Sequence, residues 1–205
     1  MDYQTLASEE SVQKTVAGLA ERGIEAIVVD DKAAALAKIK ELIPEGATVM
    51  NGSSTTLQEI GYTEYVKSGE IKFKDLHAAI TTEVDPVRRA GLRKQAITAD
   101  FYLGSVHALT EDGQFVVASG SGNQLPHIVF TSPNLILVAG TQKIVPTLAE
   151  AMKRLEKYVI PLEDKRMRDK GGKGTKANKV VIFKGEPAYS GRKVRMVLVK
   201  EKLGF

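Results

Sequence analysis

Cysteine and tryptophan are both absent from this chain of 205 residues. Without cysteine, the chain itself forms no disulfide, thiolate nucleophile, cysteine-ligated zinc site or iron–sulfur cluster. We therefore expect no cofactor in this chain, and redox chemistry would need clusters carried by partner proteins. Aromatic residues make up only 6% of the chain and the formal net charge is +4, so nucleic acid is not the expected partner.

Long apolar runs are also missing. No stretch approaches the ~20 apolar residues that a membrane-spanning helix needs. The first ten residues, MDYQTLASEE, lack the basic and apolar regions of a signal peptide. We therefore expect a cytoplasmic protein with no membrane partner. The length and the 43% hydrophobic content predict a single domain over residues 1–205.

Helical and strand patterns alternate along the first quarter of the chain. Residues 11–22 place apolar side chains at helical spacing, residues 24–30 are a short apolar run, residues 33–43 are again amphipathic, and residues 47–50 are apolar. Such β, α, β alternation is typical of parallel sheets covered by helices. The sequence therefore predicts an α/β fold with a mainly parallel central sheet, preceded by an N-terminal helical segment.

Two hairpins are predicted further along. Residues 106–110 and 114–119 are β-rich and are joined by a turn containing Asp-Gly, which is a strong signal for an antiparallel hairpin. Residues 179–185 and 192–201 are apolar runs around a turn with Pro and Gly, and they predict a C-terminal β-hairpin. Between these pairs, residues 134–140 predict a buried strand.

The first candidate binding site follows the apolar run 47–50, where a helix is predicted to begin. Ligands of open α/β sheets bind at the carboxyl ends of the strands, and backbone N–H groups with nearby hydroxyls suit a phosphate or carboxylate. The alternative is that Ser and Thr simply cap the helix. The candidate ligand-binding residues here are Asn51, Gly52, Ser53, Ser54 and Thr55.

The second candidate site follows the predicted hairpin 106–119. Glycines leave backbone N–H groups unblocked, so this stretch can wrap around an anion, although a flexible loop has the same composition. We expect the two stretches to converge in one anion-binding crevice. The candidate residues here are Ser119, Gly120, Ser121, Gly122 and Asn123.

Glu111 is the candidate catalytic residue, because a carboxylate in a tight turn can be aimed into a crevice. The alternative is a polar turn residue. The three histidines, at positions 77, 107 and 127, are too scattered for a sequence-local metal motif, so no metal site is expected. A structural role is favoured for His107 and His127, although either could reach the crevice.

Basic residues are concentrated in residues 165–179, where seven lysines and arginines surround a glycine-rich stretch. The interpretation we favour is a solvated, mobile loop, while a surface for a partner protein or RNA is the alternative. Whether this segment is ordered is left open by the sequence.

Several blocks together resemble the LUD-domain family, the lactate-utilisation LutC/YkgG-like proteins. They are NGSSTTLQEIG at 51–61, the long block 84–126 from VDPVRRAG to SGSGNQLP, VAGTQKIV at 138–145, and PLED with a terminal KEKLGF. The resemblance implies the Rossmann-like α/β fold of the NagB/RpiA/CoA transferase-like superfamily.

The resemblance also implies a function. Some members of the family are encoded with iron–sulfur proteins and act in the oxidation of L-lactate to pyruvate. By that likeness, the chain is an accessory component of L-lactate utilisation that binds a small carboxylate or phosphate metabolite and has iron–sulfur oxidoreductase subunits as partners. The alternative is a stand-alone transferase, isomerase or ligase-like enzyme acting on an acyl-CoA, a sugar phosphate or a folate. A homo-oligomer is left open.

Overall fold

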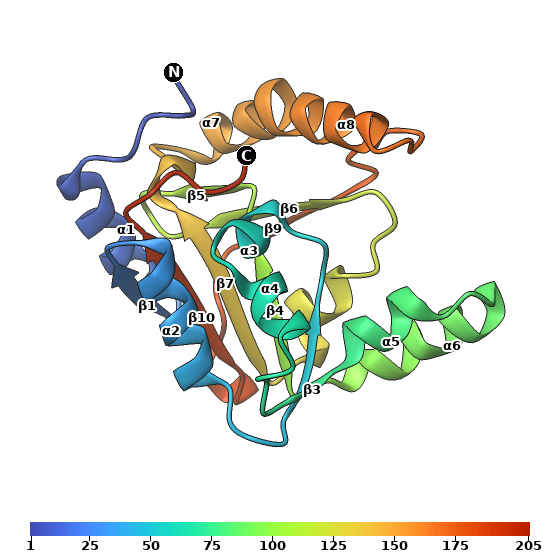
Figure 1. Ribbon diagram of the computed structural model, residues 1–205. Coiled ribbons are helices and arrows are strands. Elements are labelled where there is room, and N and C mark those ends of the chain that lie inside the picture. Colours follow the sequence, from blue (N-terminus) through green and yellow to red (C-terminus); the bar gives the residue numbers. More distant parts are fainter.

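The computed structural model describes all residues 1–205 and contains a six-stranded sheet, which lies at its centre (Figure 1). Every neighbouring pair in this sheet is parallel, which confirms the predicted α/β fold with a parallel central sheet. In order across the sheet the strands are β1 (Ile24–Val29), β10 (Lys193–Val199), β7 (Asn134–Gly140), β4 (Phe101–Ser105), β2 (Thr48–Asn51) and β3 (Lys74–Asp75).

Strand β7 is apolar throughout because both of its faces are covered. Leu135 and Leu137 belong to the core on one face, whereas Ile136 and Val138 belong to the core on the other. This is the expected pattern for a central strand of a parallel sheet. The helices that pack on the Ile136 face are α2 (Lys32–Leu42), α3 (Thr55–Glu59) and α4 (Tyr62–Lys67), and α1 (Glu9–Glu21) packs on the opposite face.

A second sheet shares the core on the α1 side of the central sheet. Its strands are, in order, β8 (Ile144–Val145), β5 (Ala108–Thr110), β6 (Phe115–Ser119) and β9 (Lys179–Phe183). β5 and β6 form the predicted antiparallel hairpin, but they do so outside the central sheet. The helical run over this sheet comprises α7 (Leu148–Arg154), the π-helical segment η4 (Leu155–Val159) and α8 (Ile160–Asp169).

The predicted C-terminal hairpin is wrong. β9 pairs with β6 in the second sheet, whereas β10 lies between β1 and β7 in the central sheet. The burial of the two strands explains the separation. Val197 and Val199 face one core and Met196 and Leu198 face the other, so β10 needs cover on both sides. β9 is an edge strand and is exposed along most of its length.

The basic segment is partly helical and not a mobile loop throughout. Residues 165–169 belong to α8, where ion pairs join Lys165 to Asp169 at 2.7 Å and Arg168 to Asp164 at 2.7 Å. Asp164 also accepts a hydrogen bond from the backbone N–H of Thr175 at 2.7 Å, which ties the glycine-rich stretch back to the helix. Asp164 and Asp169, on the same helix, therefore pair with part of the basic charge, and Asp164 also holds the stretch that follows the helix.

Two helices, α5 (Leu76–Thr82) and α6 (Pro86–Gln95), project together from the body of the molecule (Figure 1). Asp85 caps α6 by accepting hydrogen bonds from the N–H groups of Val87 and Arg88, as its place before Pro86 predicts. None of the helices is both long and apolar enough to cross a lipid bilayer. The remaining short helical turns are η1 (Ala96–Thr98), η2 (His127–Thr131), η3 (Thr141–Lys143) and η5 (Ala188–Ser190).

Candidate functional site

A cavity of about 380 Å³ lies at the carboxyl ends of three adjacent strands of the central sheet. β2 ends at Asn51, β4 ends at Ser105, and β7 leads directly into the turn that carries Lys143. All three residues line the cavity. The other walls come from α5 and α6, from the end of β6, and from η4 and α8. This is the place where open α/β sheets bind their ligands.

The structure brings the two predicted stretches together in this cavity. The lining includes Asn51, Gly52, Ser53, Ser54 and Thr55 from the first stretch, and Ser119, Gly120 and Asn123 from the second. Ser121 and Gly122 lie outside the lining. The N–H of Gly122 donates to the Ser119 hydroxyl at 2.9 Å, so this backbone donor is used within the loop itself. That the stretches bind an anion stays a prediction.

The hydroxyls of the first stretch divide into two groups. Ser54 is the N-cap of α3 and accepts from the N–H of Leu57 at 3.3 Å, so the capping role that composition allowed is present. Ser53 and Thr55 line the same cavity and make no such capping contact. Of the hydroxyl residues at 53–55, only Ser54 therefore has the capping role.

Glu111 lies outside this cavity, so the prediction that its carboxylate faces the same crevice is wrong. The hairpin β5–β6 runs away from the cavity. Its open end carries His107 and Ser119, which line the cavity, and its turn carries Glu111 at the far end. The carboxylate of Glu111 accepts a hydrogen bond from the Ser11 hydroxyl at 2.7 Å and lines a separate small cavity beside the N-terminal segment.

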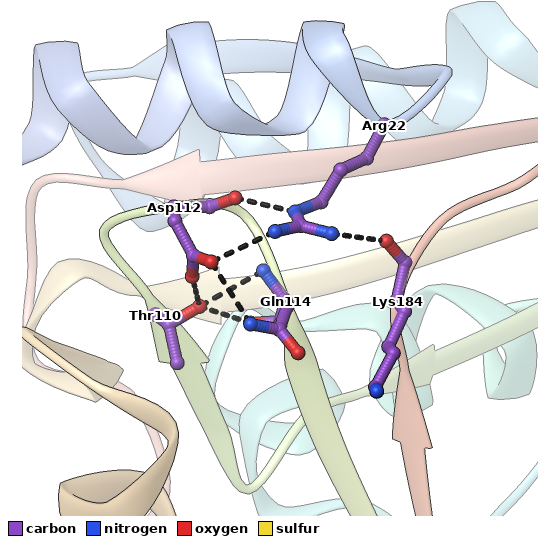
Figure 2. A network of polar contacts seen from close by, with 5 residues as sticks. All are labelled: Arg22, Thr110, Asp112, Gln114 and Lys184. Atoms are coloured by element: carbon purple, nitrogen blue, oxygen red, sulfur yellow. Dashed lines mark hydrogen bonds and ion pairs between the residues drawn. The ribbon is translucent and has the colours of Figure 1, made fainter.

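The turn of this hairpin is fastened to the end of α1 by a polar network (Figure 2). Arg22 donates to the Asp112 carboxylate at 2.7 Å, to the backbone carbonyl of Asp112, and to the carbonyl of Lys184 at 2.6 Å. Asp112 in turn accepts from the hydroxyl of Thr110 and from the amide of Gln114. Thr110, Asp112 and Gln114 therefore stabilise the turn and hold it against α1. A polar turn residue was also the alternative interpretation of Glu111.

The three histidines are in different environments. His107 lines the cavity, its Nδ1 accepts a hydrogen bond from the N–H of Ala118 at 3.1 Å, and burial together with the positive charge of Lys143 lowers its pKa to about 3. The ring is therefore neutral, with its proton on Nε2. His127 is buried, stacks on Tyr102 with 4.8 Å between ring centroids, and plays the structural role that the sequence favoured. His77 lines the cavity from α5.

Lys143 is the residue that sequence reasoning missed. Its Nζ lies 2.9 Å from the Thr56 hydroxyl, 3.0 Å from the Ser105 hydroxyl and 3.1 Å from the carbonyl oxygen of Val106. The side chain is 3% exposed and makes no ion pair, and burial lowers its pKa to about 7. The one signal in the sequence is a lysine placed between the apolar run 134–140 and the apolar pair that follows it.

Positive charge exceeds negative charge around the cavity. Its only carboxylate side chain is that of Glu163, which accepts hydrogen bonds on both oxygens from Arg166 at 2.6 and 2.7 Å. Three further basic side chains, Arg93, Lys143 and Lys176, line the cavity and form no ion pair. Lys143 is buried, whereas Arg93 and Lys176 are exposed at the cavity wall. The excess of positive charge around the cavity would attract an anion.

The fold is that of a Rossmann-like α/β protein, with a polar, cationic cavity at the carboxyl ends of its parallel strands. The chain belongs to the LUD-domain family, which it matches over residues 12–181. The family resemblance of the sequence is thereby confirmed.

Among solved structures, a DUF162 family protein from Deinococcus radiodurans is similar to this chain. The TM-score is 0.57 at 13% identity, and the match covers 95% of this chain and 99% of that one, so the likeness concerns the fold. A second match, eIF2B beta from Chaetomium thermophilum, covers 56% of this chain and 38% of that one at 17% identity. Its TM-score of 0.32 is too low to support an argument. No curated protein matches the sequence.

Proposed function

We propose that this LUD-domain protein binds a small anionic metabolite, a carboxylate or a phosphate, in the cavity at the ends of β2, β4 and β7. The observation that carries the proposal is the charge of Arg93 and Lys176, which form no ion pair, in a cavity whose single carboxylate side chain is already paired with Arg166. The cavity volume of about 380 Å³ is in the range of small-molecule sites.

Hydroxyl and amide groups complement this charge. Ser53, Thr55 and Asn51 from the first stretch and Asn123 from the second all line the cavity beside the basic side chains. Donors of this kind, held on elements of a rigid sheet, fix the orientation of an anionic ligand. A charged and polar lining of this composition favours an anion over an apolar ligand.

We further propose that the protein acts in the cytoplasm as a component of L-lactate utilisation and relies on iron–sulfur partner proteins for the oxidation of lactate to pyruvate. Membership of the LUD-domain family supports this role. The lack of cysteine supports the reliance on partners, because the chain has no thiolate with which to hold a cluster of its own.

One observation favours a second candidate, an enzyme acting on its own. A buried lysine with a pKa of about 7, at the floor of a ligand-sized cavity, is typical of catalytic sites. The substrate would come from the anionic classes that the family resemblance implies: acyl-CoA, sugar phosphates or folates. The catalytic group would then be Lys143 and not Glu111, which faces another cavity.

Calorimetric titration tests the binding proposal. The purified protein would be titrated with lactate, pyruvate, sugar phosphates, CoA esters and folates, and so would the Arg93→Gln, Lys143→Met and Glu111→Gln variants. We expect at least about tenfold weaker binding in Arg93→Gln, which loses a charge–anion interaction worth about 1.5 kcal/mol or more. We expect weaker binding in Lys143→Met as well, because that variant loses an amine that can donate hydrogen bonds to the ligand. Arg93 is exposed on α6, so its replacement leaves the core untouched.

Glu111→Gln is the matched control, and its affinity should equal that of the wild type because Glu111 lines a different cavity. Affinity that is unchanged in both basic-residue variants, or lost in Glu111→Gln alone, would contradict the proposed site. Absence of binding by every compound would contradict the proposal itself.

A further inference from the structure

We propose that Lys143 is a nucleophile, and that its Nζ forms an imine with the carbonyl carbon of a small anionic aldehyde or ketone held in the cavity. This inference rests on the proposed function, since it assigns a substrate class and a chemical step to the same cavity. The substrate class is a compound whose carbonyl lies close to an anionic group, either a 2-oxo carboxylate or a phosphorylated aldehyde or ketone.

The position of Lys143 differs from that of a structural lysine. Structural buried lysines are paired with a carboxylate, yet no carboxylate contacts Nζ. Its three neighbours are the hydroxyls of Thr56 and Ser105 and the carbonyl oxygen of Val106. All of them are neutral, so the amine is held in place without a counter-ion to fix its charge.

The hydroxyls of Thr56 and Ser105 can hydrogen-bond to the Lys143 amine in either of its protonation states. A hydroxyl both donates and accepts, so Thr56 and Ser105, whose oxygens lie 3.2 Å apart, can accept from an ammonium. When the amine is neutral, one hydroxyl can instead donate to its lone pair while the amine still donates to the Val106 carbonyl. In either state the amine, the two hydroxyls and the Val106 carbonyl all have hydrogen-bond partners, so the change of charge does not require these four groups to move.

The charged groups around Lys143 favour the neutral amine. Burial, together with the positive charge of Arg154 on α7, lowers the pKa of Lys143 to about 7, and Glu59 of α3 opposes part of this shift. The carboxylate of Glu59 is engaged elsewhere, because it accepts from the N–H of Gly204 at 2.6 Å. His107, the other ionisable neighbour, is neutral. A free amine is therefore available near neutral pH, and it is the free amine that attacks carbonyls.

Gly204 leaves room beside the Lys143 amine for the Thr56 hydroxyl. A Cβ at Gly204 would lie 2.5 Å from the Thr56 hydroxyl oxygen and 3.3 Å from Nζ of Lys143. Gly204 also has φ of +63°, which favours glycine. Only glycine therefore lets the C-terminal segment pass beside the amine without displacing the hydroxyl that holds it.

The chemical step is balanced without an oxidant or reductant. The lone pair of Nζ attacks the carbonyl carbon, the π electrons move to the oxygen, and a carbinolamine forms after proton transfer from nitrogen to oxygen. Loss of water, which contains the carbonyl oxygen and both amine hydrogens, gives the C=N bond. The Thr56 and Ser105 hydroxyls are within hydrogen-bond distance of Nζ and are placed to relay these protons. Arg93 and Lys176 remain free to hold the anionic group of the substrate.

Borohydride trapping tests the inference on the full chain. The protein would be incubated separately with pyruvate, glyoxylate, dihydroxyacetone phosphate and ribose 5-phosphate, reduced with borohydride, and examined by intact mass and peptide mapping. We expect a single stable adduct at Lys143 with one of the two compound classes, and the class that reacts identifies the substrate. The adduct should be absent in Lys143→Arg and retained in Lys40→Arg, the replacement of an exposed lysine on α2.

The pH dependence of trapping provides a second readout. The rate at Lys143 should reach half its maximum near the pKa of about 7, whereas an ordinary lysine, with a pKa of 10.5, reaches it far higher. Peptide mapping of the wild-type adduct locates the site even if Lys143→Arg fails to fold.

The outcomes separate the inference from the proposed function. Calorimetric binding of a carbonyl compound without any adduct at Lys143 would overturn the nucleophile and leave the anion site intact. Adducts on surface lysines alone would also overturn it. Neither binding nor trapping, with any of the compounds, would overturn both proposals.

Discussion

Replacing Gly18 by alanine is expected to destabilise the protein by about 3 kcal/mol, because α1 and the β5–β6 turn touch backbone to backbone at this residue. A Cβ at Gly18 would lie 2.4 Å from the carbonyl carbon of Asp112 and 2.7 Å from its oxygen. A Cβ at Gly113, in the same turn, would lie equally close to the backbone of Gly18. Neither backbone can yield without breaking the network of Arg22 and Asp112 (Figure 2).

Gly91→Ala is the matched control, since Gly91 is also inside a helix but a Cβ there would meet nothing within 4 Å. This variant should be more stable than the wild type by about 0.5–1 kcal/mol, because alanine is the better helix former. Urea unfolding of the three proteins measures both effects. A Gly18→Ala variant as stable as the wild type would contradict the close packing of α1 on the turn.

The stability of the wild type relative to Lys143→Met is expected to rise steeply with pH. The pKa of Lys143 is about 7 in the folded protein, against 10.5 for an ordinary lysine. At a pH between these two pKa values, Lys143 is protonated in the unfolded chain and neutral in the folded protein. Raising the pH in this window therefore favours the folded state. The difference in unfolding free energy between the two proteins should therefore increase by about 1.4 kcal/mol per pH unit across this window.

Denaturant unfolding at a series of pH values from mildly acidic to alkaline measures this difference. The methionine variant shares every other titrating group, including His107 and Arg154, so their contributions cancel to a first approximation. Parallel stability profiles for the two proteins would show that Lys143 keeps an ordinary pKa, and would remove the free amine on which its role as a nucleophile depends. Below the folded pKa both states are protonated, and there the difference should be flat.

The parallel sheet could be predicted because strand and helix patterns alternate along the chain and the central strand β7 is apolar on both faces. The run 134–140 has no polar face to offer to water, so helices or another sheet must cover it on either side. The second sheet could not be predicted, because the pattern of the β5–β6 hairpin is the same whichever sheet contains it. β9 and β10 likewise share a strand pattern, and only the tertiary fold assigns them to different sheets.

Part of the candidate site could be predicted because it lies at the ends of strands. Asn51 and Ser119 are the last residues of β2 and β6, residues 52–55 come directly after β2, and the end of a strand can be predicted from the sequence. Lys143 also follows a strand, but its importance depends on Thr56 and Ser105, which are 87 and 38 residues away along the chain. Glu111 was misplaced because the sequence does not say which end of a hairpin faces the cavity.

The hairpin turn at residues 111–113 also determines where the chain can be altered. Hairpin tips are ordinarily the sites at which loops are lengthened or epitopes are inserted, because they are exposed and make few contacts. Here the tip is pressed against α1 through Gly18 and Gly113, so an insertion would push apart two packed backbones. Residues 170–173 are exposed, and a Cβ at Gly171 would meet nothing within 4 Å. Peptide tags and labels for this protein are therefore better placed after α8 than at its tightest hairpin.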